Sequence, residues 1–178
     1  MNNLPLHTIG LGGSCHWCTE AVFQSLNGVE KVEQGWIASE GSYDVFSEAV
    51  IVHYDPQIIS LHDLIEIHLH THSCTSNHSM RKKYRSAVYY FTEEQQSEAT
   101  VILKYLQTDF SRPIITQILP YKSFTLNEAI WLNYYFSDIR KPFCENIINP
   151  KLQLLLARFS AKLNAQKLQH LLPQPSLA

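Results

Sequence analysis

The stretch GLGGSCHWCTE, residues 10–20, places Cys15 and Cys18 three positions apart behind a pair of glycines. The apolar run that leads into it predicts a short strand, and Gly12-Gly13 permits a sharp turn into a helix beginning at Ser14 or Cys15. Cys15 would then lie in the first turn of that helix, with Cys18 one turn later on the same face. The stretch therefore predicts a strand, a turn and a helix that carries a thiol at its entry.

Strands and helices are expected to alternate through the rest of the chain. β-Branched and apolar runs predict the strands, and helical spacing with capping signals predicts the helices. The expected strands are residues 6–11, 29–38, 45–54, 85–91 and 114–119, and the expected helices are residues 15–26, 61–70 and 93–109, with two more helical stretches after Leu126 separated by Arg140-Lys141-Pro142. This order predicts an α+β fold: a ferredoxin-like α/β sandwich with a mixed, mainly antiparallel sheet, packed helices and a C-terminal helical extension.

Length, charge and cysteine content narrow the function classes. The 178 residues show no linker, so we expect one domain over residues 1–165 and a flexible tail over 166–178. The net charge is −2 with scattered Lys and Arg, which argues against a nucleic-acid partner. Neither a membrane span nor a secretory signal is indicated, so we expect a cytoplasmic protein with no membrane partner. Four cysteines are too few for a disulfide scaffold and suggest thiol chemistry or simple burial.

The helix entry gives the cysteine pair its chemistry. Unpaired backbone N–H groups and the helix dipole favour a thiolate, so the pKa of Cys15 should fall and its sulfur should become nucleophilic. Cys18 is placed to attack an oxidised Cys15. A zinc site is the alternative, and the candidate extra ligands are His68, His70, His72, Cys74 and His78. A core histidine at 68 and solvated loop histidines account for the same residues, and no metal is expected.

Three ordered motifs go beyond the cysteine pair. They are GGSCHWCTEAVFQSLNGV, the run from Glu48 to Tyr54-Asp55-Pro56, and Lys83-Tyr84-Arg85-Ser86. Together they resemble the class A peptide methionine sulfoxide reductases, which share a glycine-cysteine-aromatic-tryptophan signature, a glutamate before an apolar run, and a Gln-Tyr-Arg-Ser strand entry. Weaker similarity at Phe124 with Glu128 and at residues 142–151 extends the resemblance over about residues 6–160.

This resemblance implies reduction of the S epimer of methionine sulfoxide, free or in proteins, to methionine. Cys15 would attack the sulfoxide sulfur and become a sulfenic acid. His16 and Trp17 would border the pocket for the substrate's methyl group, Glu48 would protonate the sulfoxide oxygen, and Tyr84 would donate a hydrogen bond to that oxygen. Protonation is needed because the sulfoxide oxygen is otherwise a poor leaving group.

The resemblance also implies how the oxidised enzyme would be recycled. Cys18, or less directly Cys144, would condense with the sulfenic acid to a disulfide, and thioredoxin or another dithiol would reduce that disulfide without a bound cofactor.

Several positions depart from the family pattern. His16 stands where the family has phenylalanine, Ser79 where it has aspartate, and Ile130-Trp131 where it has Tyr and His; Trp36 and Tyr43 are candidates for a tyrosine that has no secure counterpart. The alternative function is therefore a divergent thiol redox or binding protein on the same fold, in which substrate reduction is altered or lost.

Overall fold

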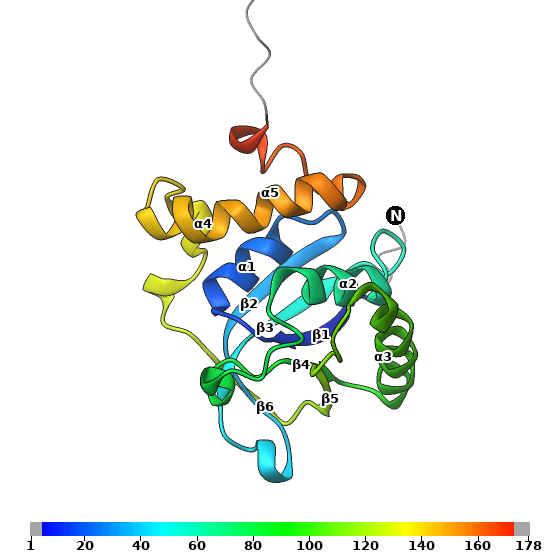
Figure 1. The fold of residues 1–178 in the computed structure, drawn as a ribbon. Helices are drawn as coiled ribbons and strands as arrows, with labels where there is room; N and C mark the ends of the chain where they lie inside the picture. The colour runs from blue at the N-terminus through cyan, green and yellow to red at the C-terminus, as the bar shows by residue number, and fades with distance from the viewer. Residues whose placement is uncertain (1–4, 173–178) are drawn as a thin grey trace, which may run out of the picture.

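The computed structural model describes residues 5–172 as an α+β sandwich built on one six-stranded sheet (Figure 1). The strand order across the sheet is β5-β4-β1-β3-β2-β6. The strands are β1 His7–Gly12, β2 Val29–Ala38, β3 Ser47–Tyr54, β4 Ala87–Tyr90, β5 Gln117–Pro120 and β6 Ser123–Leu126. The helices are α1 His16–Gln24, α2 Leu61–Thr71, α3 Glu93–Leu106, α4 Tyr134–Ser137 and α5 Asn149–Arg158, with a π-helix at Cys144–Ile148 directly before α5.

The order and direction of the strands confirm the ferredoxin-like prediction. Strands β1 to β4 are interleaved with α1 and α2, and β1 pairs antiparallel with both β3 and β4, while β2 pairs antiparallel with β3. Helix α3 then returns the chain so that β5 lies parallel to β4. The sheet is therefore mixed and mainly antiparallel, as the alternating elements predict.

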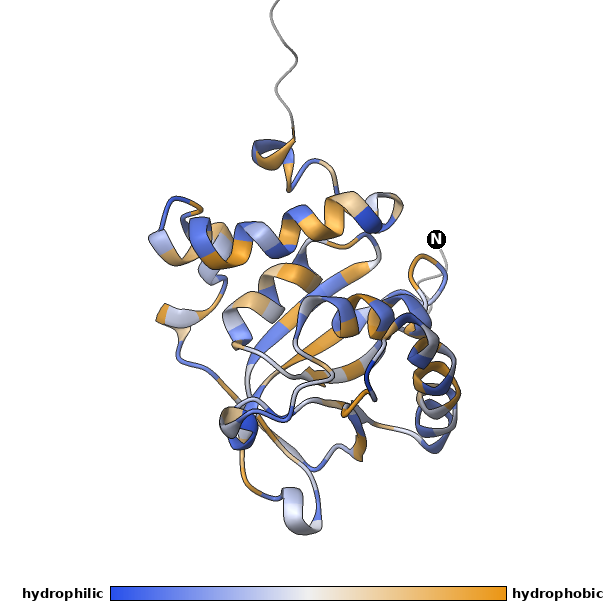
Figure 2. Cartoon of the chain, in the orientation of Figure 1, coloured by the Kyte–Doolittle hydropathy of each residue, from blue (hydrophilic) through white to orange (hydrophobic). Residues whose placement is uncertain are grey.

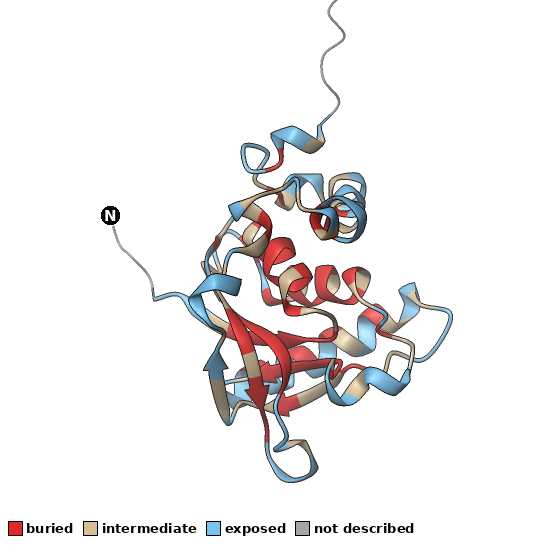
Figure 3. Ribbon diagram, turned by 90° about the vertical axis from the view of Figure 1, so that its left-hand side faces the viewer, coloured by how far each residue is buried: buried red, intermediate tan, exposed pale blue. Residues whose placement is uncertain are grey.

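The core lies mainly between the sheet and the helices. Strands β1 and β3 are the central pair and are almost fully buried (Figure 3). Helices α1 and α2 cover one face, and α5 lies across α1 with apolar and hydrophilic residues alternating along its length (Figures 1 and 2). A smaller cluster, which includes Ile37, Ile51 and Tyr89, packs on the opposite face. Within residues 5–172 no helix combines the length and apolar character that a membrane span requires.

The turn before α1 depends on Gly13. Its φ is +156°, and a Cβ added there would lie 2.5 Å from the His72 ring. Only glycine fits this position without moving that ring. The turn brings the start of α1 against the segment that follows α2, so residues distant in sequence meet at the helix entry.

The C-terminal third differs from the sequence-based prediction. Strand β6, which pairs antiparallel with β2, was not expected, and the first expected helical stretch after Leu126 is reduced to single turns at Ala129–Trp131 and Tyr134–Ser137. Residues 123–126 form a strand because they pair with β2. Since β2 is far away in the sequence, no local pattern indicates this pairing. The second helical stretch is present as the π-helix and α5.

Part of the segment expected as a tail is described. Leu168 is buried, and the Lys167 ammonium donates a hydrogen bond to the Gln24 carbonyl at 2.7 Å. The start of the expected tail therefore packs near the C-terminal end of α1. Residues 173–178 lie outside the described residues.

Candidate active site around Cys15

Cys15 is the residue immediately before the first turn of α1. Its carbonyl accepts the N–H groups of Cys18 and Thr19, both at 3.1 Å, and no side chain caps the helix start. The Cys15 pKa is lowered, first because the Cys18 thiol donates a hydrogen bond to it and then because the Trp17 and Cys18 N–H groups point at it. Burial and the Glu48 charge oppose this shift. The thiolate is thus favoured at the position where the sequence predicts it.

Cys18 is buried on the same helix. Its pKa is raised by the hydrogen bond it gives to Cys15, by burial, and by the charges of Cys15 and Cys144. The two thiols therefore differ in character: Cys15 is the one that ionises, and Cys18 holds its proton against it. Cys144, at the start of the π-helix, is also buried, and burial raises its pKa. All four cysteines are free thiols.

Glu48 reaches the helix entry from β3. Its Oε2 accepts the His16 N–H at 3.0 Å, and its Oε1 lies 3.3 Å from the Lys83 ammonium. The side chain is almost completely buried. The Glu48 N–H also bonds the Lys83 carbonyl at 2.9 Å, which fixes the start of β3 to the segment that carries Tyr84. A buried carboxylate is thus held against the first turn of α1.

A pocket of about 320 Å³ opens at Cys15. Gly13, Ser14 and Cys15 form one part of its wall, and Tyr84 and His72 form another. The structure therefore places Cys15 and Tyr84 in one pocket. Glu48 is not in the pocket lining and contacts the first turn of α1 through the His16 N–H.

The comparisons with known proteins show the family of this chain. The family model described as peptide methionine sulfoxide reductase matches residues 7–163. The chain belongs to this family. The MsrA peptide methionine sulfoxide reductase of Deinococcus radiodurans is 36% identical over 167 residues, which cover 85% of this chain and 81% of that protein.

Solved structures of yeast Mxr1 share the reductase fold. The reduced form of Mxr1 from Saccharomyces cerevisiae superposes with a TM-score of 0.69 at 23% identity and covers 80% of this chain and 91% of its own. Mxr1 in complex with Trx2 has a TM-score of 0.59 at 22% identity and covers 71% of this chain and 84% of its own. At these identities the likeness shows the fold.

Trp17 lies beside the reductase pocket and not in its lining. Its ring stacks on Tyr134 at 4.1 Å between centroids with an interplanar angle of 4°, and Phe143 meets it edge-on. The Trp17 Nε1 is buried and has no hydrogen-bond partner among the described residues. Trp17 is therefore covered by the segment between β6 and α5, and Tyr134 is a neighbour that sequence reasoning missed.

Glu20 holds that covering segment in place. This buried carboxylate accepts the Asn133 and Tyr134 N–H groups at 2.8 and 3.2 Å and the Gln34 amide at 2.8 Å. Its pKa is raised by burial, while these hydrogen bonds act in the opposite direction. The sequence signal for this role was a glutamate five residues after Cys15, on the buried face of the predicted helix, where a charged side chain needs hydrogen-bond partners.

His16 points into the sheet and not into the pocket lining. Its Nδ1 donates to the Gly35 carbonyl at 3.3 Å, its Nε2 accepts from the Asn127 amide at 3.3 Å, and the ring meets Trp36 edge-on. Burial lowers the His16 pKa, which matches the neutral ring that these two bonds require. Asn127, just after β6, thus satisfies the polar ring that stands where the family has phenylalanine.

The remaining departures are not among the residues that line the Cys15 pocket. Of the two candidates for the missing tyrosine, Trp36 contacts His16, whereas Tyr43 packs with Arg85 in a different pocket. Ser79 opens a short 3₁₀ turn and is exposed.

The histidine-rich stretch does not assemble as the zinc alternative requires. His68 and His72 are held by the Gly12 carbonyl, the His68 carbonyl and Ser86. Among residues 5–172, the group of three potential ligands whose atoms all lie within 4.8 Å of one another is Glu66, His70 and Asp109. The Arg158 guanidinium donates to His70 Nδ1 at 3.1 Å, so the ring proton lies on Nε2, and that nitrogen cannot ligate in this tautomer.

Proposed function

We propose that this protein reduces the S epimer of methionine sulfoxide, free or in proteins, to methionine. The observation that carries the proposal is the pairing of a thiol of lowered pKa at the entry of α1 with a buried carboxylate bound to the same helix turn at 3.0 Å. A thiolate is the nucleophile that the reaction needs, and a carboxyl group in its protonated form is the proton donor.

The proposed chemistry balances with these residues. The Cys15 thiolate attacks the sulfoxide sulfur while Glu48 protonates the oxygen and Tyr84 holds it by a hydrogen bond. The sulfoxide S–O bond breaks and the protonated oxygen passes to the Cys15 sulfur. The substrate sulfur is thereby reduced by two electrons and leaves as methionine, and Cys15 is oxidised to the sulfenic acid. Neither Trp17 nor His16 lines the Cys15 pocket, so the expected contact of Trp17 with the substrate's methyl group would require Tyr134 to move off its ring.

Cys18 is the proposed resolving residue. Its thiol already contacts Cys15, and its attack on the sulfenic acid forms the disulfide and releases water. A thioredoxin-type dithiol would reduce this disulfide; the related fold of Mxr1 has been solved in complex with Trx2. We propose that no bound cofactor takes part, and that the protein works in the cytoplasm, where thiols stay reduced.

The test is an epimer assay with purified protein. The two epimers of a methionine sulfoxide peptide are incubated with dithiothreitol, and methionine is quantified. The S epimer should be converted and the R epimer should not, and Cys15→Ser should abolish conversion. A protein that binds the S epimer without turning it over would be the divergent redox or binding protein instead.

A further inference from the structure

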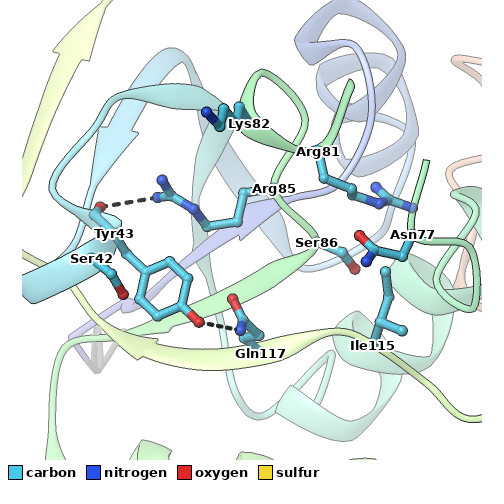
Figure 4. Close-up of a pocket in the computed structure, with 9 residues that line it drawn as sticks. All are labelled: Ser42, Tyr43, Asn77, Arg81, Lys82, Arg85, Ser86, Ile115 and Gln117. Atoms are coloured by element: carbon cyan, nitrogen blue, oxygen red, sulfur yellow. Dashed lines mark hydrogen bonds between the residues drawn. The ribbon is translucent and has the colours of Figure 1, made fainter. Parts of the chain in front are cut away.

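A second pocket, of about 360 Å³, carries unmatched positive charge. Figure 4 shows the side chains that line it. Arg81, Lys82 and Arg85 line it, and no Asp or Glu does. None of these three side chains forms an ion pair with another described residue. This concentration of charge is unusual in a chain whose net charge is −2.

The guanidinium of Arg85 is more than nine-tenths buried and still has donors to spare. Its Nη1 donates to the Tyr43 carbonyl at 3.1 Å and the Tyr89 hydroxyl at 3.4 Å, and its Nη2 donates to the Val45 carbonyl at 2.8 Å. A guanidinium has five N–H donors. The Nε–H and one Nη2–H of Arg85 therefore have no partner among the described residues.

The rest of the pocket adds neutral donors without adding negative charge. In Figure 4, Tyr43 and Arg85 stand on one side, Asn77 and Arg81 on the other, and Ser86 and Gln117 lie between them. The amide of Asn77 and the ammonium of Lys82 are exposed and make no hydrogen bond to the described residues. Such a set of cationic and amide donors suits a carboxylate or another oxyanion.

Arg81 joins this pocket to the proposed active site. Its Nη1 donates at 2.9 Å to the carbonyls of Gly13 and Tyr84, and both of these residues line the Cys15 pocket. Burial lowers the Arg81 pKa, and no carboxylate acts against this shift. Arg81, which lines the charged pocket, is thus bonded to the backbone of two residues that line the Cys15 pocket, and this connects the two pockets.

We propose that the pocket of Arg81, Lys82 and Arg85 binds the carboxylate of an acidic residue near methionine sulfoxide in a protein substrate. This inference rests on the proposed function, because it assigns a preference to the same reaction. It makes the protein a reductase that favours oxidised methionines in acidic sequence contexts.

The kinetic test uses paired peptides. Each pair contains the S epimer of methionine sulfoxide and differs only in Glu or Gln at one position, and that position is moved along both sides of the oxidised residue. We expect kcat/KM to be about threefold or more higher for Glu than for Gln at one or more positions, mainly through KM, since exposed ion pairs give effects of this size. Added salt should reduce the ratio.

The variants are Lys82→Gln and Asn77→Asp, with Lys104→Gln as the matched control. Lys104 is exposed on α3, away from the pocket, and its substitution changes the net charge equally. The Glu-to-Gln ratio should fall toward one in Lys82→Gln and Asn77→Asp and stay unchanged in Lys104→Gln, while turnover of the Gln peptide stays at the wild-type level in all three. A ratio of one at every position, or a ratio indifferent to Lys82→Gln, overturns the proposal.

A binding measurement separates this inference from the proposed function. Acetylated glutamate amide is titrated into the ¹⁵N-labelled protein, and the side-chain amide signals of Asn77 and Gln117 are followed. Saturable shifts that Lys82→Gln weakens support the site even if no peptide is reduced. Shifts that inorganic phosphate reproduces and the glutamate probe does not would overturn the assignment to a carboxylate.

Discussion

The two thiols of α1 are unequal because of where each lies. Cys15 receives a hydrogen bond from Cys18 and faces backbone N–H groups, whereas Cys18 is buried and donates. The pKa of Cys15 is lowered and that of Cys18 is raised, so Cys18 stays a protonated thiol while the Cys15 thiolate reacts. The pattern of two cysteines three apart gives no hint of this asymmetry, and the helix start supplies it.

Cys18→Ser should permit one turnover and then stall. The variant keeps the attacking thiol and loses the group that forms the disulfide, so thioredoxin has no disulfide to reduce. The measurement is methionine released per protein molecule with thioredoxin as the reductant, with Cys74→Ser, a buried thiol outside the Cys15–Cys18 pair, as the control. Undiminished recycling in Cys18→Ser that is lost on adding Cys144→Ser would move the resolving role to Cys144.

Glu48→Gln separates the ionisation of Cys15 from catalysis. The Glu48 charge raises the Cys15 pKa, so its removal should lower that pKa and raise the thiolate fraction near neutral pH. Reduction should nevertheless slow by about 10²-fold or more, the usual contribution of a general acid. The rate of Cys15 alkylation against pH reports the first effect, and single-turnover kinetics report the second.

Unchanged single-turnover kinetics in Glu48→Gln would remove Glu48 from the proposed reaction. A fall in both alkylation and reduction would instead indicate that the variant disturbs the entry of α1, where Glu48 accepts the His16 N–H.

At the scale of elements, the turn between β1 and α1 decides whether Cys15 meets Tyr84. Gly13→Ala should destabilise the protein by roughly 1–3 kcal/mol, because it adds backbone strain at a φ of +156° and a methyl group against the His72 ring. Gly41→Ala is the matched control, since Gly41 has a φ of +59° and open space around it.

Urea unfolding measures both glycine variants. The loss should be larger in Gly13→Ala, because a φ of +156° is almost restricted to glycine while a φ of +59° is tolerated by other residues, and because the clash with His72 adds to it. Equal losses would mean that neither the backbone at Gly13 nor the His72 ring resists the added methyl group. A drop in Cys15 reactivity in Gly13→Ala alone would show that the turn also sets the helix entry.

Elements with local signals were predictable, and elements made by distant partners were not. The Ser60–Asp63 and Thr92–Gln95 caps and the β-branched run of β3 are contained within their own segments, and the structure has these elements near the expected bounds. Strand β6 has only four residues and forms because β2 offers it an edge.

The same division applies to the site residues. The resemblance of three ordered motifs to the reductase family pointed to Glu48 and Tyr84, while the predicted helix start gave a local signal for Cys15. The stack of Tyr134 on Trp17 and the bond from Asn127 to His16 depend on the path of residues 121–143, which no local pattern predicts.

At the scale of the whole molecule, two stacked histidines, one buried and one partly buried, make stability depend on pH. His68 and His72 stack at 4.2 Å behind the Gly12-Gly13 turn. The Nε2 of His68 bonds the Gly12 carbonyl, and both ring nitrogens of His72 are hydrogen-bonded, to the His68 carbonyl and to Ser86. Burial lowers the pKa of His68 to about 4 and holds that of His72 well below its usual value. The folded state therefore excludes protons that the unfolded chain accepts.

Stability should accordingly fall as the solution is acidified. The contribution of His68 is fully present above the unfolded-state pKa of about 6.5 and is lost progressively as pH falls toward 4, by on the order of a few kcal/mol. Urea midpoints measured across this range should decline, and His68→Gln should flatten the decline. His7→Gln, at an exposed position, is the control; an identical slope in His68→Gln would exclude the buried ring as the cause.

The position of α1 beneath α4 and α5 also orders events during synthesis. The chain leaves the ribosome from its N-terminus, so Cys15 and Cys18 emerge long before residues 134–158, which cover their helix. Through most of translation the reactive pair is therefore present without its cover. A nascent chain of this protein is most exposed to oxidants before its last third has been made.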